Sequence, residues 1–247
     1  ELACGWQGQG KLPDPQDIFL AAQALFGKQD FAGKTLLVTA GPTREEIDPV
    51  RFLSNYSSGK MGYAIAAAAS HRGARVVLVS GPVNIPEPHG VETIQVCSAL
   101  EMHRAVMAEA EHADIVIKAA AVADFRPTTC CEQKVKKGSS ETMMVELQRN
   151  PDILAELGAK KGSQILIGFA AETEALLNNA REKLTKKNLD LIVANDVTQE
   201  GAGFDGDTNI VRFLSADGAV EELPQMSKDA VAEKLLDRVS ALMLKAY

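Results

Sequence analysis

A long polar segment after the first apolar run of the chain could bind phosphate. It occupies residues 40–59, where connections of ~2–6 residues are usual in this kind of pattern. It ends in Ser57, Ser58 and Gly59, immediately before an alanine-rich stretch typical of a helix. Unpaired backbone N–H groups and the helix dipole favour an anion at such a helix start. A plain helix start with glycine for close packing accounts for the same residues, so both interpretations stay open.

Small residues after a later apolar run could accept a nucleotide. Ala119, Ala120 and Ala121 would let a flat ligand approach the backbone, and Asp124 follows as a contact for a ribose or a metal. Residues that follow buried strands are the usual ligand contacts in open α/β sheets. The alternative is a tightly packed strand exit that ends in a solvated aspartate.

Two groups of lysines could neutralise a polyphosphate. One is the basic cluster at 134–138, and the other comprises Lys183, Lys186 and Lys187 at helical spacing. The chain has a net charge of −7, so a polyanion needs a local basic cluster, and nucleic acid is not an expected partner. A solvated charge run and an ordinary helix surface are the alternatives.

Other chemistries lack their residue patterns. Lys60 is followed by Met61 rather than Ser or Thr, so the segment is no P-loop, and no Gly-x-Gly-x-x-Gly is present. Neither a Ser-His-Asp nor a Cys-His arrangement can be argued from spacing, and the four histidines form no metal-ligand pattern. The remaining chemistry is positioning and charge neutralisation, which is typical of nucleotidyl transfer.

Alternating apolar runs and helical patterns must position these residues. Apolar runs predict strands at 34–39, 75–80, 91–96, 114–119, 164–170 and 190–194. Helices are predicted at 17–26, 60–72, 98–112, 174–187 and after Ser227. Another is predicted with Asn150 as its N-cap and Pro151 as its first residue. This order predicts an α/β fold, a Rossmann-like, doubly wound, mostly parallel sheet. Asp217-Gly218 adds a late antiparallel hairpin.

Composition limits the class of protein and its location. The chain has 247 residues, of which 46% are hydrophobic and 24% charged, as in a globular protein. No apolar run approaches the ~20 residues that span a bilayer, and no signal peptide is visible, so a cytoplasmic protein without membrane contact is expected. Its four cysteines are expected to be free thiols. The chain begins with Glu1, which suggests a piece of a longer protein.

Several motifs in order resemble bacterial phosphopantothenoylcysteine synthetase, a phosphopantothenate–cysteine ligase. They are TAGPTR at 39–44, DPVR at 48–51, Ser54-Asn55, SSGKMG at 57–62, AAAVADF at 119–125, KVKK at 134–137, NPDI at 150–153, GFAAET at 168–173, KNLD at 187–190 and Asn195-Asp196. The resemblance makes 34–247 the synthetase domain. Residues 1–33 then comprise a linker and the tail of an upstream decarboxylase domain, whose glycine-rich end residues 1–16 resemble. The rest of that domain is missing, so neither decarboxylase activity nor flavin is expected here.

The resemblance implies a ligase of coenzyme A biosynthesis that uses CTP and Mg²⁺. The carboxylate of 4′-phosphopantothenate would attack the α-phosphate of CTP and release pyrophosphate. The amine of L-cysteine would then attack the acyl-cytidylate and release CMP. Mg²⁺ would bind through phosphate oxygens and water rather than through a protein cage. The family also implies a homodimer and an N-terminal decarboxylase domain in the full-length chain.

The matched motifs assign roles to particular residues. Asn55 would hold the acyl-cytidylate carbonyl or the pantothenate amides, and Lys134 would neutralise phosphate charge. Arg51 would serve the substrate or the neighbouring site of the dimer. The nucleotide would contact Ser57, Ser58, Gly59, Ala119, Ala120, Ala121, Asp124, Pro151, Asp152, Ile153, Leu154, Phe169, Lys183 and Lys187.

Two rival functions use the same fold. An NAD(P)-dependent oxidoreductase fits the fold class, but the glycine fingerprint is missing and Tyr63 is followed by Ala67 instead of the lysine of a Tyr-x-x-x-Lys pair. A nucleotide-binding domain that is inactive without its missing N-terminal domain is the second rival. Binding without turnover would identify it.

Overall fold

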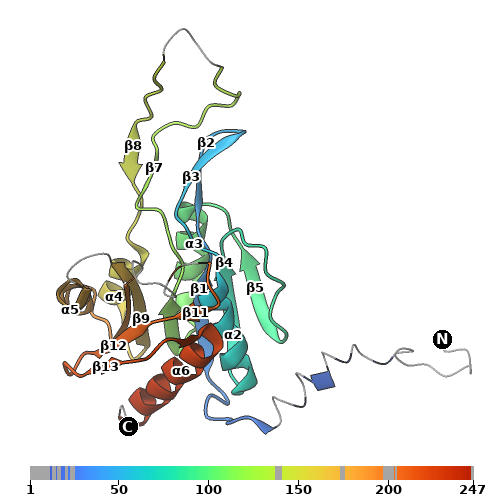
Figure 1. Cartoon of the computed structure of the whole chain (residues 1–247), viewed down its shortest axis with the longest axis vertical. Helices are drawn as coiled ribbons and strands as arrows, with labels where there is room; N and C mark the ends of the chain where they lie inside the picture. Colours follow the sequence, from blue (N-terminus) through green and yellow to red (C-terminus); the bar gives the residue numbers. More distant parts are fainter. Residues whose placement is uncertain are drawn as a thin grey trace, which may run out of the picture.

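The structure is a computed structural model that describes residues 12, 15, 18, 19, 22, 26–136, 141–172, 176–196, 203 and 205–245. Within these residues the main sheet has eight strands, in the order β13-β12-β10-β9-β6-β1-β4-β5. Six of them pair in parallel (Figure 1), namely β1 (Thr35–Ala40), β4 (Arg75–Ser80), β5 (Val91–Gln95), β6 (Ile115–Lys118), β9 (Ile165–Glu172) and β10 (Leu191–Asp196). The predicted mostly parallel sheet is confirmed.

The strand order reverses in the middle of the sheet. The chain runs from β1 outward to β4 and β5, and then returns to place β6 on the other side of β1. The β1–β6 boundary is therefore the switch point, where the connections that leave the two carboxyl ends diverge and open a crevice. The order of the six parallel strands is that of a dinucleotide-binding doubly wound sheet.

Helices cover both faces of the sheet. On one face lie α2 (Lys60–His71) and α6 (Lys228–Lys245), and on the other α3 (Ala99–Ala110), α4 (Ile153–Lys160) and α5 (Leu176–Lys186). Leu36 and Val38 of β1 pack on the first side and Leu37 on the second, and all three are fully buried. Burial on both faces explains why β1 is a continuous apolar run.

The late hairpin is confirmed. It consists of β12 (Val211–Ser215) and β13 (Val220–Glu222), which pair antiparallel at the edge next to β10. Gly218 takes the left-handed conformation, with φ 86°, that its turn requires. A further short pair joins β11 (Thr208–Asn209) to β14 (Met226–Ser227) before α6.

The segment at 40–59 is more ordered than the predicted long loop. Most of it folds into an antiparallel hairpin of β2 (Arg44–Asp48) and β3 (Arg51–Ser54). A second pair, β7 (Phe125–Pro127) and β8 (Leu147–Arg149), lies beside it, and both project from the body of the molecule (Figure 1). Short polar strands of this kind have little apolar alternation, so the sequence pattern did not reveal them.

The predicted start of α4 was wrong by two residues. Asp152, not Asn150, is the N-cap, and its side chain accepts a hydrogen bond from the Ala155 N–H at 3.0 Å. Asn150 instead donates its side-chain amide to the Ala123 carbonyl at 2.8 Å, and its own N–H is bound to the Asp124 carbonyl. These bonds keep Asn150 with the β7–β8 pair. The predicted helix at 17–26 lies mostly outside the described residues.

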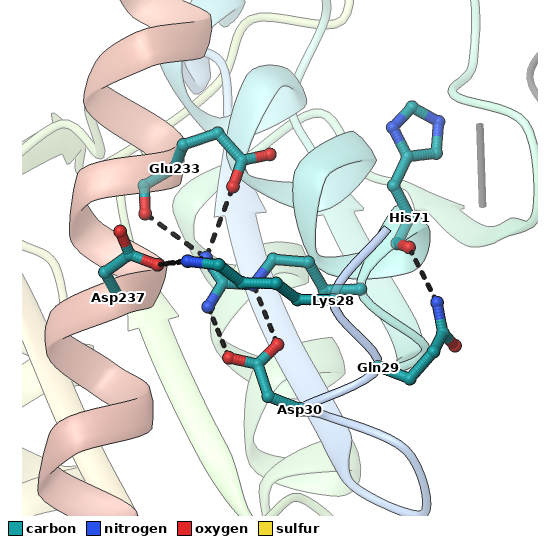
Figure 2. Close-up of polar contacts among 7 residues, drawn as sticks. Lys28, Gln29, Asp30, His71, Glu233 and Asp237 are labelled. Atoms are coloured by element: carbon teal, nitrogen blue, oxygen red, sulfur yellow. Dashed lines mark hydrogen bonds and ion pairs between the residues drawn. The ribbon is translucent and has the colours of Figure 1, made fainter. Parts of the chain in front are cut away.

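A buried arginine joins the segment before β1 to both helices of one face. Arg72, at the end of α2, is 3% exposed, and its guanidinium pairs with Asp30, with Glu233 at 3.2 Å and with Asp237 at 3.0 Å. Lys28 also binds Asp237 at 2.9 Å (Figure 2). These contacts, here called the Arg72 cluster, lie at the end of α2 that points away from the switch point.

Candidate functional site

A cavity of about 430 Å³ opens at the switch point. Most of its wall comes from three places: the connection from β3 into α2, the end of β6 with the residues after it, and the middle of β9. The rest of the lining is Asn195, Gly203, Asn209 and Lys228. The predicted residues that line it are Asn55, Ser57, Ser58, Gly59, Ala119, Ala120, Ala121 and Phe169. The structure thus brings together residues that lie far apart in the sequence.

The start of α2 lies directly on the end of β1. A Cβ atom on Gly62 would be 2.5 Å from the Ala40 Cβ and 2.8 Å from the Thr39 carbonyl oxygen, so only glycine allows this approach. Gly59 is the N-cap, with φ 80° and no side-chain cap. The first N–H groups of a helix have no partner within the helix. At α2 they border the cavity and can receive an anion.

Hydrogen bonds fix the alanine segment after β6. Ala121 donates its N–H to the Gly41 carbonyl at 2.9 Å, and Ala120 donates to the Thr39 hydroxyl at 3.1 Å. Asn55 donates its side-chain amide to the Val122 carbonyl at 3.1 Å. The amide oxygen of Asn55 remains as an acceptor on the wall of the cavity. The alanines therefore form a rigid, narrow wall of the kind that a planar ring can contact.

A second cavity of about 390 Å³ adjoins the first. The predicted residues that line it are Asp124, Pro151, Asp152, Leu154, Phe169, Lys183 and Lys187. Lys187 pairs with Asp152 at 2.8 Å. Burial raises the pKa of the Asp152 carboxyl, but the hydrogen bonds from Lys187 and the Ala155 N–H and the charges of Lys187 and Lys118 together bring the pKa below its ordinary value. Asp152 is therefore charged and compensates part of the lysine charge.

Three predicted residues lie apart from both cavities. Ile153 is 1% exposed and packs in the core between the sheet and α3 and α4. Lys134 is exposed and lies between β7 and β8, and Arg51 opens β3 on the projecting hairpin. Arg51 pairs there with Asp48 at 3.1 Å, and a ligand for Lys134 would have to reach the projecting strands.

The sequence interpretation missed Lys118, the last residue of β6. It lines both cavities, and no hydrogen bond or salt bridge joins its ammonium to another residue in the described part of the chain. Burial and then the charge of Lys187 lower its pKa to about 8. A lysine at the end of an otherwise apolar strand was the signal. An unpaired cation between two cavities is suited to an anionic ligand.

Other kinds of site are not found in the described residues. No group of three His, Cys, Asp or Glu side chains there could hold a metal ion. No helix there is long and apolar enough to cross a membrane. The arrangement is one of backbone N–H groups, small residues and lysines around a crevice. It can bind and orient a phosphorylated ligand and neutralise its charge.

Fold and site together define a doubly wound α/β protein with an anion-binding crevice at its switch point. The sequence pattern of the family described as "DNA/pantothenate metabolism flavoprotein C-terminal domain" matches residues 31–243. The chain belongs to this family. The match covers every strand of the main sheet and every residue that lines the two cavities.

Curated relatives are bifunctional proteins. The chain is 53% identical over 245 residues to the coenzyme A biosynthesis bifunctional protein CoaBC of Bacillus subtilis (strain 168) and 46% identical over 245 residues to that of Vibrio cholerae. Each alignment covers 98% of this chain but only 60% and 61% of the relative. The chain therefore spans about three fifths of their length.

Solved structures share the fold. A crystal structure of the C-terminal domain of CoaBC is 45% identical, has a TM-score of 0.76, and covers 88% of this chain and 100% of its own. The structure titled "Cab2 mutant H337A complex with phosphopantothenate-cysteine" is 18% identical, with a TM-score of 0.72 and 96% of each chain covered. The second likeness supports the fold alone.

Proposed function

We propose that this chain joins 4′-phosphopantothenate to L-cysteine at the expense of CTP. The observation that carries the proposal is the crevice at the switch point, where the start of α2, the alanine segment and Lys118 converge. The relatives of the chain are named for coenzyme A biosynthesis, which agrees with this substrate class. A phosphorylated carboxylic acid and a nucleoside triphosphate both need an anion-binding crevice.

The reaction would proceed in two displacement steps. A carboxylate oxygen of phosphopantothenate attacks the α-phosphorus of CTP, and the bond to pyrophosphate breaks. The cysteine amine then attacks the acyl carbon, loses a proton, and CMP leaves with the bonding pair. Neither step needs a covalent bond to the protein. Positioning and charge neutralisation therefore supply the catalysis.

The residues would divide these tasks. The alanine segment and Phe169 would hold the nucleotide, and Lys118 and Lys187 would face its phosphates. Asn55 would contact the reacting carbonyl or the pantothenate amides. Lys134 would approach the phosphates from the projecting strands. CTP would arrive as its Mg²⁺ complex, with the ion on phosphate oxygens and water.

The full-length protein would carry a second activity. We propose that residues 1–33 are a linker and the tail of a decarboxylase domain, and that 34–247 are the synthetase domain. The length of the curated relatives supports this division, since the chain covers about three fifths of them. The synthetase would act as a homodimer, with Arg51 directed to the neighbouring site.

Pyrophosphate release tests the proposal. We expect release from CTP, more than from ATP, that requires 4′-phosphopantothenate, and formation of the cysteine amide when L-cysteine is added. The measurement is a coupled pyrophosphate assay with mass spectrometry of the product. Nucleotide binding without turnover, in both this chain and the full-length protein, would contradict the ligase and favour a binding domain.

Binding of CTP is expected to take up a proton through Lys118. In the free protein the pKa of Lys118 is about 8, and a bound phosphate favours the charged ammonium and raises it. Uptake should therefore be small below pH 7 and approach about one proton per site near pH 9. Calorimetry in two buffers of different ionisation enthalpy measures it.

The matched variants are Lys118→Met and Lys160→Met. Lys118→Met should abolish the uptake and weaken CTP binding by about 10-fold or more, because a charged hydrogen bond is lost. Lys160 is exposed on α4 and pairs with Glu156, so Lys160→Met should change neither. Undiminished uptake in Lys118→Met would show that another group binds the proton.

A further inference from the structure

Asp48 is a buried carboxylate at the tip of the β2–β3 hairpin, and the reaction proposed above gives it no role. Its side chain is 0% exposed. One oxygen, Oδ1, accepts the N–H groups of Val50 at 2.8 Å and Arg51 at 2.9 Å, which closes the turn between the two strands. The other oxygen, Oδ2, accepts the Arg51 guanidinium at 3.1 Å. These bonds alone would make Asp48 an ordinary turn residue.

A further set of bonds joins Asp48 and Arg51 to a distant part of the chain. Oδ2 of Asp48 also accepts the N–H of Val135 at 3.1 Å. The Arg51 guanidinium donates to the carbonyl oxygen of the same Val135 at 3.3 Å. Both main-chain polar groups of Val135 are thus held by one ion pair, and the residue before Val135 is Lys134.

The segment around Lys134 has few other attachments of this kind. Cys131 donates its N–H to the Ile47 carbonyl at 3.0 Å, again on the β2–β3 hairpin. Residues 131–134 are exposed. They belong to the connection between β7, which ends at Pro127, and β8, which begins at Leu147. The Lys134 side chain is therefore located by two attachments of its backbone to the hairpin, one on each side.

The charge state of Asp48 suits this arrangement. Burial raises the pKa of its carboxyl, but the N–H groups of Val50, Val135 and Arg51 and the charge of Arg51 together lower it below its ordinary value. The carboxylate is charged at neutral pH, and so it can accept all four hydrogen bonds.

We propose that Asp48, with Arg51, is a positioning residue. Their hydrogen bonds to the main chain of Val135 place Lys134 for the reaction. This inference rests on the proposed function, in which Lys134 neutralises phosphate charge. A displacement of a catalytic group by ~1 Å can reduce turnover about 100-fold. Loss of the hydrogen bonds to Val135 therefore reduces kcat, while the substrates still bind in the crevice, which lies apart from the hairpin tip.

The test variant is Asp48→Asn. The amide oxygen can still accept from Val50 and Arg51, which preserves the turn, but the NH₂ group cannot accept from the Val135 N–H. We expect faster hydrogen exchange at Val135, a fall in kcat of about 10- to 100-fold and a nearly unchanged KM for CTP. Glu46→Gln, an exposed change on the same strand, is the matched control and should alter neither.

A double-mutant cycle with Lys134→Ala decides between positioning and a general structural role. If Asp48 acts through Lys134, Asp48→Asn causes no further loss of kcat in the Lys134→Ala background. A further loss by the same factor, or an unchanged kcat in the single variant, would overturn the inference. No turnover in the unsubstituted chain would overturn the proposed function instead. Hydrogen exchange at Val135 would still show whether Asp48 holds the Val135 N–H.

Discussion

Replacement of Arg72 by methionine is expected to lower the free energy of unfolding by about 3 kcal/mol, the low end of the range for breaking a buried ion pair. The guanidinium is buried, and it also lies 5.1 Å from the ring centre of Phe31. Its removal leaves Asp30, Glu233 and Asp237 close together without their common cation. These carboxylates are partly exposed, which keeps the loss from being larger.

The matched control is Arg75→Met. Arg75 pairs with Glu92 at 3.0 Å, but both side chains are more than half exposed, so the expected loss is about 0.5 kcal/mol or less. Denaturant titration measures both, and the melting temperature of Arg72→Met should fall by roughly 6–12 °C. Equal losses in the two variants would contradict the role given to the Arg72 cluster.

The loss in Arg72→Met depends on pH in a known direction. The hydrogen bond from Arg72 holds the pKa of Asp30 below its ordinary value, against the effect of burial. A carboxyl with a lowered pKa in the folded state contributes stability above its unfolded pKa of about 3.9. That contribution is lost as the pH falls through the folded pKa. The difference between the protein and Arg72→Met should therefore shrink below about pH 4.

Turnover in Asn55→Ala is expected to fall by about 100- to 1,000-fold, as when one preorganised polar group is removed from a reaction centre. The Asn55 amide lines the first cavity and is itself held by the Val122 carbonyl. It is therefore oriented before the substrate arrives. Alanine removes the amide and with it the contact proposed for the reacting acyl group.

Pyrophosphate release at saturating CTP and phosphopantothenate measures the effect. Asn55 is exposed, so the free energy of unfolding of Asn55→Ala should lie within about 0.5 kcal/mol of that of the unsubstituted chain. Gln148→Ala, on the exposed strand β8, is the control for the substitution itself. Near-normal turnover in Asn55→Ala would remove this residue from the proposed mechanism.

The parallel sheet could be predicted because its strands carry their own signal. Residues 34–39 and 75–80 are unbroken apolar runs, and they became β1 and β4 within one residue. A strand that is buried on both faces must be apolar throughout. The projecting pairs β2–β3 and β7–β8 have polar exposed faces, so their pairing depends on contacts that a local pattern does not contain.

The candidate site could be predicted in part. Ser57, Ala120 and Lys187 follow or precede predicted elements at the sheet edge, and each lines one of the two cavities. The sequence could not show that Ile153, unlike its neighbours, would lie apart from the cavities. The reason is that α4 begins two residues later than the Asn-Pro signal suggested. Lys118 was missed because its importance arises from burial between two cavities, which only the assembled sheet creates.

The positions of the two ends of α2 indicate where this protein can be labelled or immobilised. One end borders the crevice at the switch point, and the other carries Arg72, which pairs with Asp30, two residues after Lys28. The helix has 12 residues, a rod of about 18 Å at 1.5 Å per residue. A surface tether or fluorescent label attached just ahead of Lys28 would be held at the far end of this rod. The tether would then be separated from the crevice by the length of α2, so we expect ligand to enter an immobilised sample.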